Sequence, residues 1–320
     1  MQMKRRNVFL SFILLLALFL GCSLIFLKSR RDTEIKKELN VIGAQIENDP
    51  IVEKLLESMQ STQSTQSVLA GKTEESKEDY SLTPEQKRRA EQLISLFENG
   101  KIEIQYGYAE NLDDGRGITA GRAGFTTRDG DAYMVVKVYS QKKPGNKLEK
   151  YLDALRKLAE DESGSTDGLS GFGKVWKDAS KDAKFRDSQD YVVDKLYFQP
   201  SQKYADNLGL KTAIARAFLY DTIIQHGDGG DKDSISALIK TTNSKAGGSP
   251  KEGTDELQWF KEFMNVRRND LSNANDEETR DAWKDSVSRV DVYKQIFEDK
   301  NYDLKGPIKI KTKDYNETIP

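Results

Sequence analysis

The sequence predicts a mainly α fold (α+β) with a small β element and a long buried central helix. Apolar residues recur at helical spacing in four segments, residues 147–160, 207–225, 255–269 and 277–299. The second segment is apolar on nearly all sides, which is typical of a helix at the centre of a domain. Glycine-containing turns at residues 113–117 and 124–131 predict a small β element rather than a large sheet.

The composition divides the chain into three parts. We expect an N-terminal signal or membrane-anchor segment over residues 1–31, a polar linker over residues 32–80 and a folded domain over residues 81–320. The 320 residues, 37% of them hydrophobic, supply enough apolar material for a sizeable core. A short helix near residues 49–61 interrupts the linker, which otherwise provides reach and no chemistry.

Residues 8–27 form an uncharged apolar run that follows Lys4, Arg5 and Arg6. This pattern is typical of an export signal or a retained anchor, because the run is about long enough to cross a bilayer as a helix. Cys22 marks either a lipoprotein cleavage site or an ordinary cysteine of an apolar helix. We therefore expect the rest of the chain to be extracellular, secreted or tethered to the outer face of the cell membrane, with this segment as its membrane contact.

The part after residue 31 has no cysteine, so neither a disulfide nor a thiol nucleophile is available to it. Residues 1–31 carry six of the 50 basic side chains and no acidic ones, which leaves 44 basic against 52 acidic side chains in the rest. This acidity argues against nucleic acid as a partner, because phosphates need a basic surface. It is compatible with a cationic partner and equally with ordinary solubility.

The segment from residue 83 predicts a helix that ends at a carboxylate. TPEQ at residues 83–86 combines a threonine N-cap, a proline at the first helical position and a glutamine three residues after the cap. The Asn-Gly pair at residues 99–100 is a C-terminal stop, so Glu98 lies on the last turn. Residues 102–108 then alternate in the manner of a strand.

Glu98 and Asp114 stand in opposite surroundings. Glycoside hydrolysis needs one carboxyl that is protonated, to supply a proton to the leaving oxygen, and another that is ionised. Desolvation by the apolar stripe of Ile94 and Phe97 favours the acid form of Glu98, whereas Asp114 in a polar turn stays ionised. The spacing alone leaves open that Glu98 is an ordinary solvated residue and that Asp114 belongs to an ordinary turn.

Five longer stretches resemble the secreted bacterial chitosanases with a lysozyme-like fold, particularly those of bacilli. They are LISLFENG, IQYGYAENLDDGRGITAGRAGFTT, GDAYMVVKVYS, NLGLKTAIARAFLYDTIIQHGDG and SRVDVYKQIF. The resemblance covers the chain from about residue 82 to the C-terminus and makes residues 81–320 a chitosanase catalytic domain. It implies two mainly helical lobes that flank a cleft.

The resemblance also implies the roles of the acidic pair. Glu98 matches the general acid of these enzymes and Asp114 the general base of an inverting hydrolysis, while Thr119 helps to position the attacking water. Two departures lie beside these residues. Ile118 stands where the family commonly has tyrosine, which puts rate or subsite preference in doubt, and Ala120 stands where some relatives have cysteine.

Chitosan is a polymer of glucosamine whose amines are charged at mildly acid pH, so a cleft that binds it needs carboxylates aimed at ammonium groups. Asp131 matches a family aspartate implicated in sugar binding, although a helix N-cap would use the same carboxylate. Glu110, Arg116 and Tyr108 are further candidates for binding substrate, each of which could also be an ordinary hairpin residue.

Asp221 lies inside the apolar run IARAFLYDTIIQ, where a buried carboxylate is costly unless it is paired with a cation. The resemblance places Arg267 and Arg289 in a network with this aspartate that reaches the general acid. The network either adjusts Glu98 or is a purely structural ion pair.

His226 is the only histidine and begins the loop HGDGGDKDS. A lone loop histidine is usually structural, whereas the resemblance puts it near the sugar cleft, in reach of substrate. The acidic side chains of Asp228, Asp231 and Asp233 lack the spacing and the later glutamate of an EF-hand calcium site. We expect neither a metal nor a cofactor.

These observations favour an exported, monomeric, endo-acting chitosanase that cleaves β-1,4 links between glucosamine units with inversion. Two alternatives stay open. One keeps the fold but takes peptidoglycan as the substrate. The other is a surface protein that binds chitosan without cleaving it.

Overall fold

The computed structural model describes residues 49–54, 80–275 and 280–320, of which those from Ile51 onward form one compact unit. The predicted signal or anchor and most of the predicted linker lie outside the described residues. Within the described part, no helix has the length and apolar character to cross a membrane.

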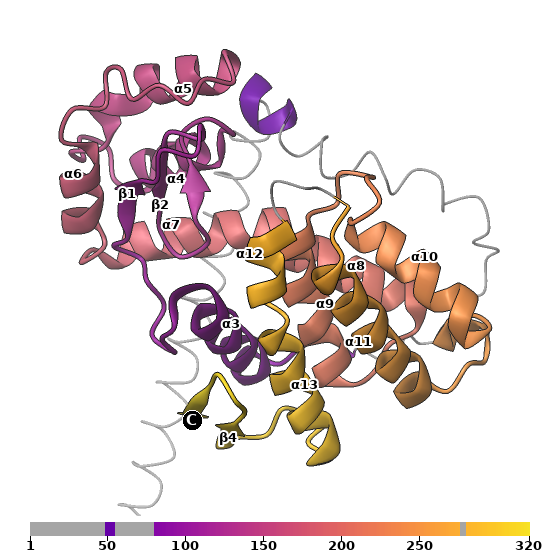
Figure 1. Cartoon of the computed structure of the whole chain (residues 1–320). Helices are drawn as coiled ribbons and strands as arrows, with labels where there is room; N and C mark the ends of the chain where they lie inside the picture. The colour runs from indigo at the N-terminus through magenta and orange to yellow at the C-terminus, as the bar shows by residue number, and fades with distance from the viewer. Residues whose placement is uncertain (1–48, 55–79, 276–279) are drawn as a thin grey trace, which may run out of the picture. The chain divides into compact units, whose positions relative to one another are not determined.

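Helices dominate this unit (Figure 1), which confirms the predicted mainly α class. They are α3 (Pro84–Asn99), α4 (Asp131–Lys142), α5 (Leu152–Glu160), α6 (Phe172–Ala179), α7 (Ala183–Val193), α8 (Gln199–Leu208), α9 (Ala213–His226), α10 (Ile235–Ala246), α11 (Glu256–Ser272), α12 (Arg280–Asp285) and α13 (Ser288–Glu298). One antiparallel sheet has the order β1 (Ala109–Asn111), β2 (Ile118–Ala120), β3 (Phe125–Thr126). A separate hairpin joins β4 (Ile308–Lys311) and β5 (Asn316–Ile319).

The centre of the core is α9, as its all-round apolar sequence predicts. Every residue from Ala213 to Ile223 is buried, and α3, α8, α10 and α13 pack around the helix. The predicted segment 207–225 nevertheless contains a break. Gly209 adopts the left-handed conformation (φ 75°) that ends α8, and α9 begins four residues later. The predicted segment 277–299 is likewise divided, into α12 and α13.

A long helical run crosses from the sheet side of the unit to α9. It consists of α7, a wide π turn at Asp194–Phe198 and α8. Pro200 lies just after the wide turn and has no N–H to donate to the preceding turn, which accounts for the local change in the hydrogen-bond ladder. No periodicity in the sequence predicts that these helices are continuous.

The helix α3 begins and ends where the sequence predicts. Thr83 and Gln86 form a reciprocal capping box, and Gly100 closes the helix in a left-handed conformation (φ 66°). The predicted strand over residues 102–108 is wrong, because this segment consists of bends and turns. Side chains take the place of a partner strand: the Trp176 and Gln189 side chains both donate to the backbone carbonyl of Tyr106.

Candidate active site

A cleft of about 830 Å3 runs between α3, the small sheet and the α9 to α13 region. Each of these elements contributes side chains to its lining. Among them are Glu98 from α3, Thr119 from β2, Gln225 from α9, Trp283 from α12 and Arg289 from α13. The structure therefore brings Glu98 and Thr119 to one cavity, whereas Asp114 is not among the residues that line it.

The Glu98 carboxylate is held by a buried network. The Arg289 guanidinium donates to Glu98 Oε1 (2.8 Å) and to Asp221 Oδ1 (3.3 Å), and Arg267 donates to Asp221 Oδ2 (2.6 Å). The side chains of Asp221 and Arg267 are fully buried, and that of Arg289 is 4% exposed. These contacts are the ones expected for the three residues, so the costly buried carboxylate is compensated by two cations.

The surroundings of Glu98 differ from those predicted. Its side chain is 38% exposed and points to Arg289 rather than into the apolar stripe. The stripe residue Ile94 is buried one turn earlier in α3. The Glu98 carboxylate is therefore not desolvated, because it lies on the last turn of α3 and faces Arg289 at the cleft.

Asp114 lies in the turn between β1 and β2 and is paired locally. Its Oδ1 accepts from the backbone N–H of Arg116 (3.0 Å), and its Oδ2 accepts from two nitrogens of the Arg116 side chain. The hydrogen bond from the Arg116 side chain is the main cause that lowers the pKa of Asp114 below its ordinary value. The carboxylate is thus kept ionised, as predicted for this turn. Arg116 itself lines the cleft.

Thr119 sits at the middle of the sheet, where its Cα pairs with those of Glu110 and Thr126. It is 6% exposed, and its hydroxyl has no hydrogen-bond partner among the described residues. A buried hydroxyl without a partner is costly unless it binds water or ligand. The tight turn before it requires glycine, since Gly117 has φ 76° and a Cβ there would lie 2.3 Å from the Thr127 hydroxyl.

The other predicted binding residues lie at different depths. Tyr108 lines the cleft and donates to Glu110 (3.3 Å), which is exposed and lines a separate groove. Asp131 is 7% exposed at the first turn of α4, where its Oδ1 accepts from the backbone N–H groups of Thr126 and Ala132. Burial raises the pKa of Asp131 to about 7. The N-cap of α4 is Gly130, and α4 has no side-chain cap hydrogen bond, so the N-cap interpretation of Asp131 is wrong. Sugar binding by Asp131 stays a prediction.

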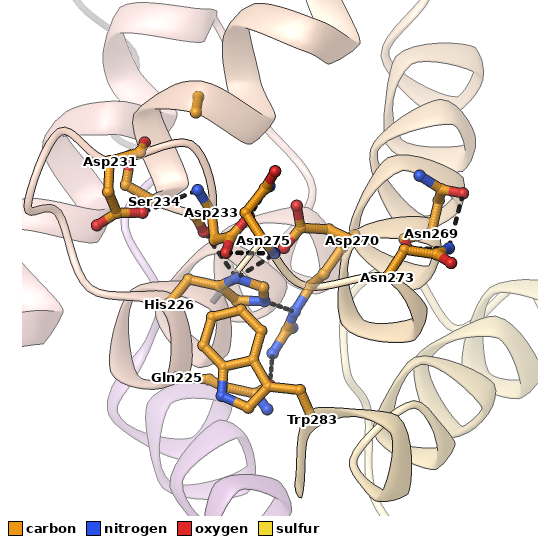
Figure 2. Close-up of polar contacts among 12 residues, drawn as sticks. Gln225, His226, Asp231, Asp233, Ser234, Asn269, Asp270, Asn273, Asn275 and Trp283 are labelled. Atoms are coloured by element: carbon orange, nitrogen blue, oxygen red, sulfur yellow. Dashed lines mark hydrogen bonds and ion pairs between the residues drawn. The ribbon is translucent and has the colours of Figure 1, made fainter. Parts of the chain in front are cut away.

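His226 is the last residue of α9, directly before the predicted loop, and it is buried. It lies behind Trp283, with ring centroids 4.7 Å apart (Figure 2). The acidic side chains that follow are engaged separately: Asp228 accepts from Tyr204, and Asp233 accepts from Asn275. Among the described residues, no group of three or more side chains of metal-binding type is placed to hold an ion.

Comparison with known proteins identifies this architecture. The sequence model of glycosyl hydrolase family 46 matches residues 92–308, more than half of the chain. The chain belongs to glycosyl hydrolase family 46. It is 57% identical over 238 residues to a chitosanase of Bacillus subtilis (strain 168), a match that spans 74% of this chain and 86% of that protein.

Solved structures agree. The crystal structure of a native chitosanase from Bacillus subtilis MY002 has a TM-score of 0.70 and 57% identity, and the match covers 75% of this chain and all of the other. A mutant chitosanase from the same source, complexed with 6 GlcN, has the same TM-score, identity and coverage. The predicted lysozyme-like fold class is thereby confirmed for this family 46 member.

Sequence reasoning missed a second ionic cluster of this family 46 domain. Arg122, 8% exposed and on the cleft lining, pairs with Glu91 of α3 (3.1 Å) and with Asp190 of α7. Arg122 therefore connects the turn after β2 to α3 and α7. Glu91 follows Lys87 at helical spacing and pairs with it, which is a readable signal. Arg122 follows a glycine turn and carries no periodic signal at all.

The departure at position 118 faces away from the main cleft. Ile118 is partly exposed and lines the groove of about 310 Å3 that Glu110 also lines. Any effect of this residue on substrate preference would therefore act through that groove. Ala120, by contrast, is fully buried in β2.

Proposed function

We propose that this chain is an endo-acting chitosanase that hydrolyses β-1,4 links between glucosamine units with inversion. Membership of family 46 and the similarity to chitosanases support the reaction class. The observation that carries the assignment is the shared cleft, where Glu98, anchored from α13, lies in one cavity with Thr119 and with Arg116, the partner of Asp114.

In the proposed reaction, protonated Glu98 gives its proton to the leaving glycosidic oxygen. Asp114 takes a proton from a water molecule, and that water attacks the anomeric carbon from the opposite face of the sugar. A carboxylate has about four lone-pair sites, so Asp114 can accept from a water while Arg116 still donates to it. The partnerless hydroxyl of Thr119 supplies a further contact for this water.

Two charge-neutral substitutions test the roles. Glu98→Gln keeps the shape but has no proton to donate, and Asp114→Asn cannot accept one from water. Each should lower turnover of chitosan by roughly a hundredfold or more while the melting temperature changes little. Release of reducing ends from chitosans of graded acetylation measures the turnover, and Glu160→Gln, an exposed carboxylate at the end of α5, is the matched control.

The outcomes separate the alternatives. NMR of the first-formed product should show the α anomer, and a β product would contradict inversion and the base role of Asp114. Faster turnover of peptidoglycan than of fully deacetylated chitosan would change the substrate class. Binding of chitosan without any reducing-end release would make the protein a binder. Near-normal turnover by Glu98→Gln would remove Glu98 from the acid role.

We further infer an extracellular or membrane-tethered location from the basic start and the apolar run of residues 8–27. A surface outside the cytoplasm would give the enzyme access to a polymer that does not enter cells. Fractionation of a host that expresses the full chain tests this inference, because activity confined to the cytoplasm would contradict it.

A further inference from the structure

Trp283 differs from the other two tryptophans of the chain. Trp176 and Trp259 are fully buried in the core. Trp283, on the short helix α12, is partly exposed and lines the cleft together with Ile224 and Ser286. A partly exposed indole on the wall of a cleft is unusual for packing reasons alone, because its large apolar surface would be better removed from water.

A buried histidine lies directly behind the indole (Figure 2). The rings of His226 and Trp283 meet edge to face, at an interplanar angle of 67°. Both ring nitrogens of His226 are fixed: Nε2 accepts from Arg267 Nε (3.3 Å), so Nδ1 carries the proton and donates to the Asp233 carbonyl (2.9 Å). Burial is the main cause that lowers the pKa of His226 well below its usual value. The support of Trp283 is thus a rigid, neutral ring.

Arg267 links this support to the buried network that holds Glu98. Arg267 donates to Asp221, to Gln225 and to His226 at once. Gln225 in turn donates to the Ser286 hydroxyl (2.6 Å), three residues after the tryptophan. The indole is therefore held from behind by His226 and from the following turn by Gln225. Such fixed placement is what a binding residue requires, because little rotamer freedom is left to lose.

The charges on the cleft lining leave few negative groups to bind a cationic sugar. Four cationic side chains contribute to it, Lys101, Arg116, Arg122 and Arg289, against the one carboxylate of Glu98. A cationic sugar therefore finds few negative partners on the lining itself. An indole attracts a cation through its negative ring face and also covers the apolar C–H face of a sugar ring.

We propose that Trp283 is a substrate-binding platform that stacks against one glucosamine unit of the polymer in the cleft. The proposal rests on the proposed function, since it takes a glucosamine polymer as the ligand. Trp283 does not touch the reacting atoms in this scheme. It contributes the same interaction to the bound substrate and to the transition state, so its loss should raise KM and leave kcat nearly unchanged.

Intrinsic fluorescence tests the contact directly. In the Glu98→Gln background, where the ligand is not consumed, a glucosamine hexamer should change the emission, because Trp283 is the tryptophan that ligand can reach. The Trp283→Tyr variant should lose this signal and yet bind the hexamer within about threefold of the parent by calorimetry. Trp283→Leu, which keeps apolar volume without a ring, should raise Kd about tenfold, which corresponds to about 1.4 kcal/mol.

The comparison of Tyr with Leu guards against a folding artefact, and equal melting temperatures of the two variants are checked first. If Trp283→Leu binds the hexamer as tightly as Trp283→Tyr, the platform is refuted. An unchanged emission in the Glu98→Gln parent, with binding seen by calorimetry, refutes it as well. Failure of the proposed function looks different, because then the parent itself would not bind the hexamer at all.

Discussion

The two walls of the cleft hold their carboxylates by different means. Glu98 is bound by Arg289, which lies 191 residues further along the chain and is fixed from behind by the fully buried Asp221. Asp114 is bound by Arg116, two residues away, and both side chains of this pair are about a third to a half exposed. One wall depends on the folded core, whereas the other depends on a single turn.

This difference predicts how each wall responds to damage. In the buried network, the loss of one partner leaves a desolvated charge without compensation, which destabilises the whole domain. In the exposed pair, solvent screens the charge that is left, so the fold should tolerate the change. Substitutions of the buried residues behind Glu98 should therefore lower stability, whereas substitutions in the exposed Asp114 turn should change the catalytic chemistry with little effect on stability.

The largest effect is expected for Asp221→Ala. It leaves Arg267 and Arg289 facing each other in the core without their shared carboxylate. We expect a loss of about 3 to 5 kcal/mol in the free energy of unfolding, and a fall of roughly 10 °C in Tm. Thermal and urea unfolding measure these changes, and the pH dependence of activity should change too because Arg289 loses its anchor.

An exposed ion pair serves as the control for this substitution. Asp291 pairs with Arg268, and their side chains are 44% and 37% exposed. Asp291→Ala should cost less than about 1 kcal/mol. If Asp221→Ala proves as mild as Asp291→Ala, the buried network does not support the Glu98 wall and the contrast between the walls is wrong.

The second largest effect concerns Asp131, a buried carboxylate at the first turn of α4 that accepts hydrogen bonds from backbone N–H groups. Its pKa is about 7 in the folded protein because of burial, against about 3.9 when unfolded. The folded state thus binds more protons between these values, and stability falls as pH rises through this window. Asn does not ionise, so Asp131→Asn should not show this fall in stability with rising pH.

The free energy of unfolding of Asp131→Asn relative to the parent should therefore rise by roughly 2 to 4 kcal/mol between pH 4 and pH 8. Urea unfolding at several pH values measures it. Asp228 and Asp270, whose pKa values burial raises to about 6 and about 7, titrate in the same window but contribute equally to both proteins. A difference that stays constant with pH would show that Asp131 is ionised in the folded state.

The contrast between local and distant contacts also explains which features could be predicted from the sequence. The local features were readable: the capping box that positions α3, the Asp-Gly turn that holds Asp114 and the apolar helix α9 all depend on residues within a few positions of one another. The strand predicted at residues 102–108 failed because the backbone there bonds to the distant side chains of Trp176 and Gln189. The alternation of side-chain types alone cannot distinguish a strand from an irregular segment whose backbone bonds to side chains.

Contacts between residues far apart in the sequence could not be predicted from the spacing of apolar residues. Burial in an apolar run predicted that Asp221 needs a cation, but only the resemblance to a family indicated which arginines supply it. The exposure of Glu98 was predicted wrongly for a related reason, because its partner Arg289 lies 191 residues further along the chain. Arg122 and Trp283 gave no sequence signal, since their placement depends on glycine turns and on packing against residues far along the chain.

The smallest effect on stability, and the sharpest test of the Asp114 wall, is expected for Arg116→Gln. The substitution removes the side-chain hydrogen bonds that lower the pKa of Asp114, so this pKa should rise toward its ordinary value. As a general base, Asp114 must be ionised, and the acid limb of the pH profile of kcat/KM should therefore move to higher pH. The free energy of unfolding should change by less than about 1 kcal/mol, because the pair is exposed. Arg128→Gln, which removes an exposed arginine off the cleft lining, should leave the acid limb in place. If the limb does not move in Arg116→Gln either, then another group controls it, and the local pairing of Asp114 has no part in keeping the base ionised.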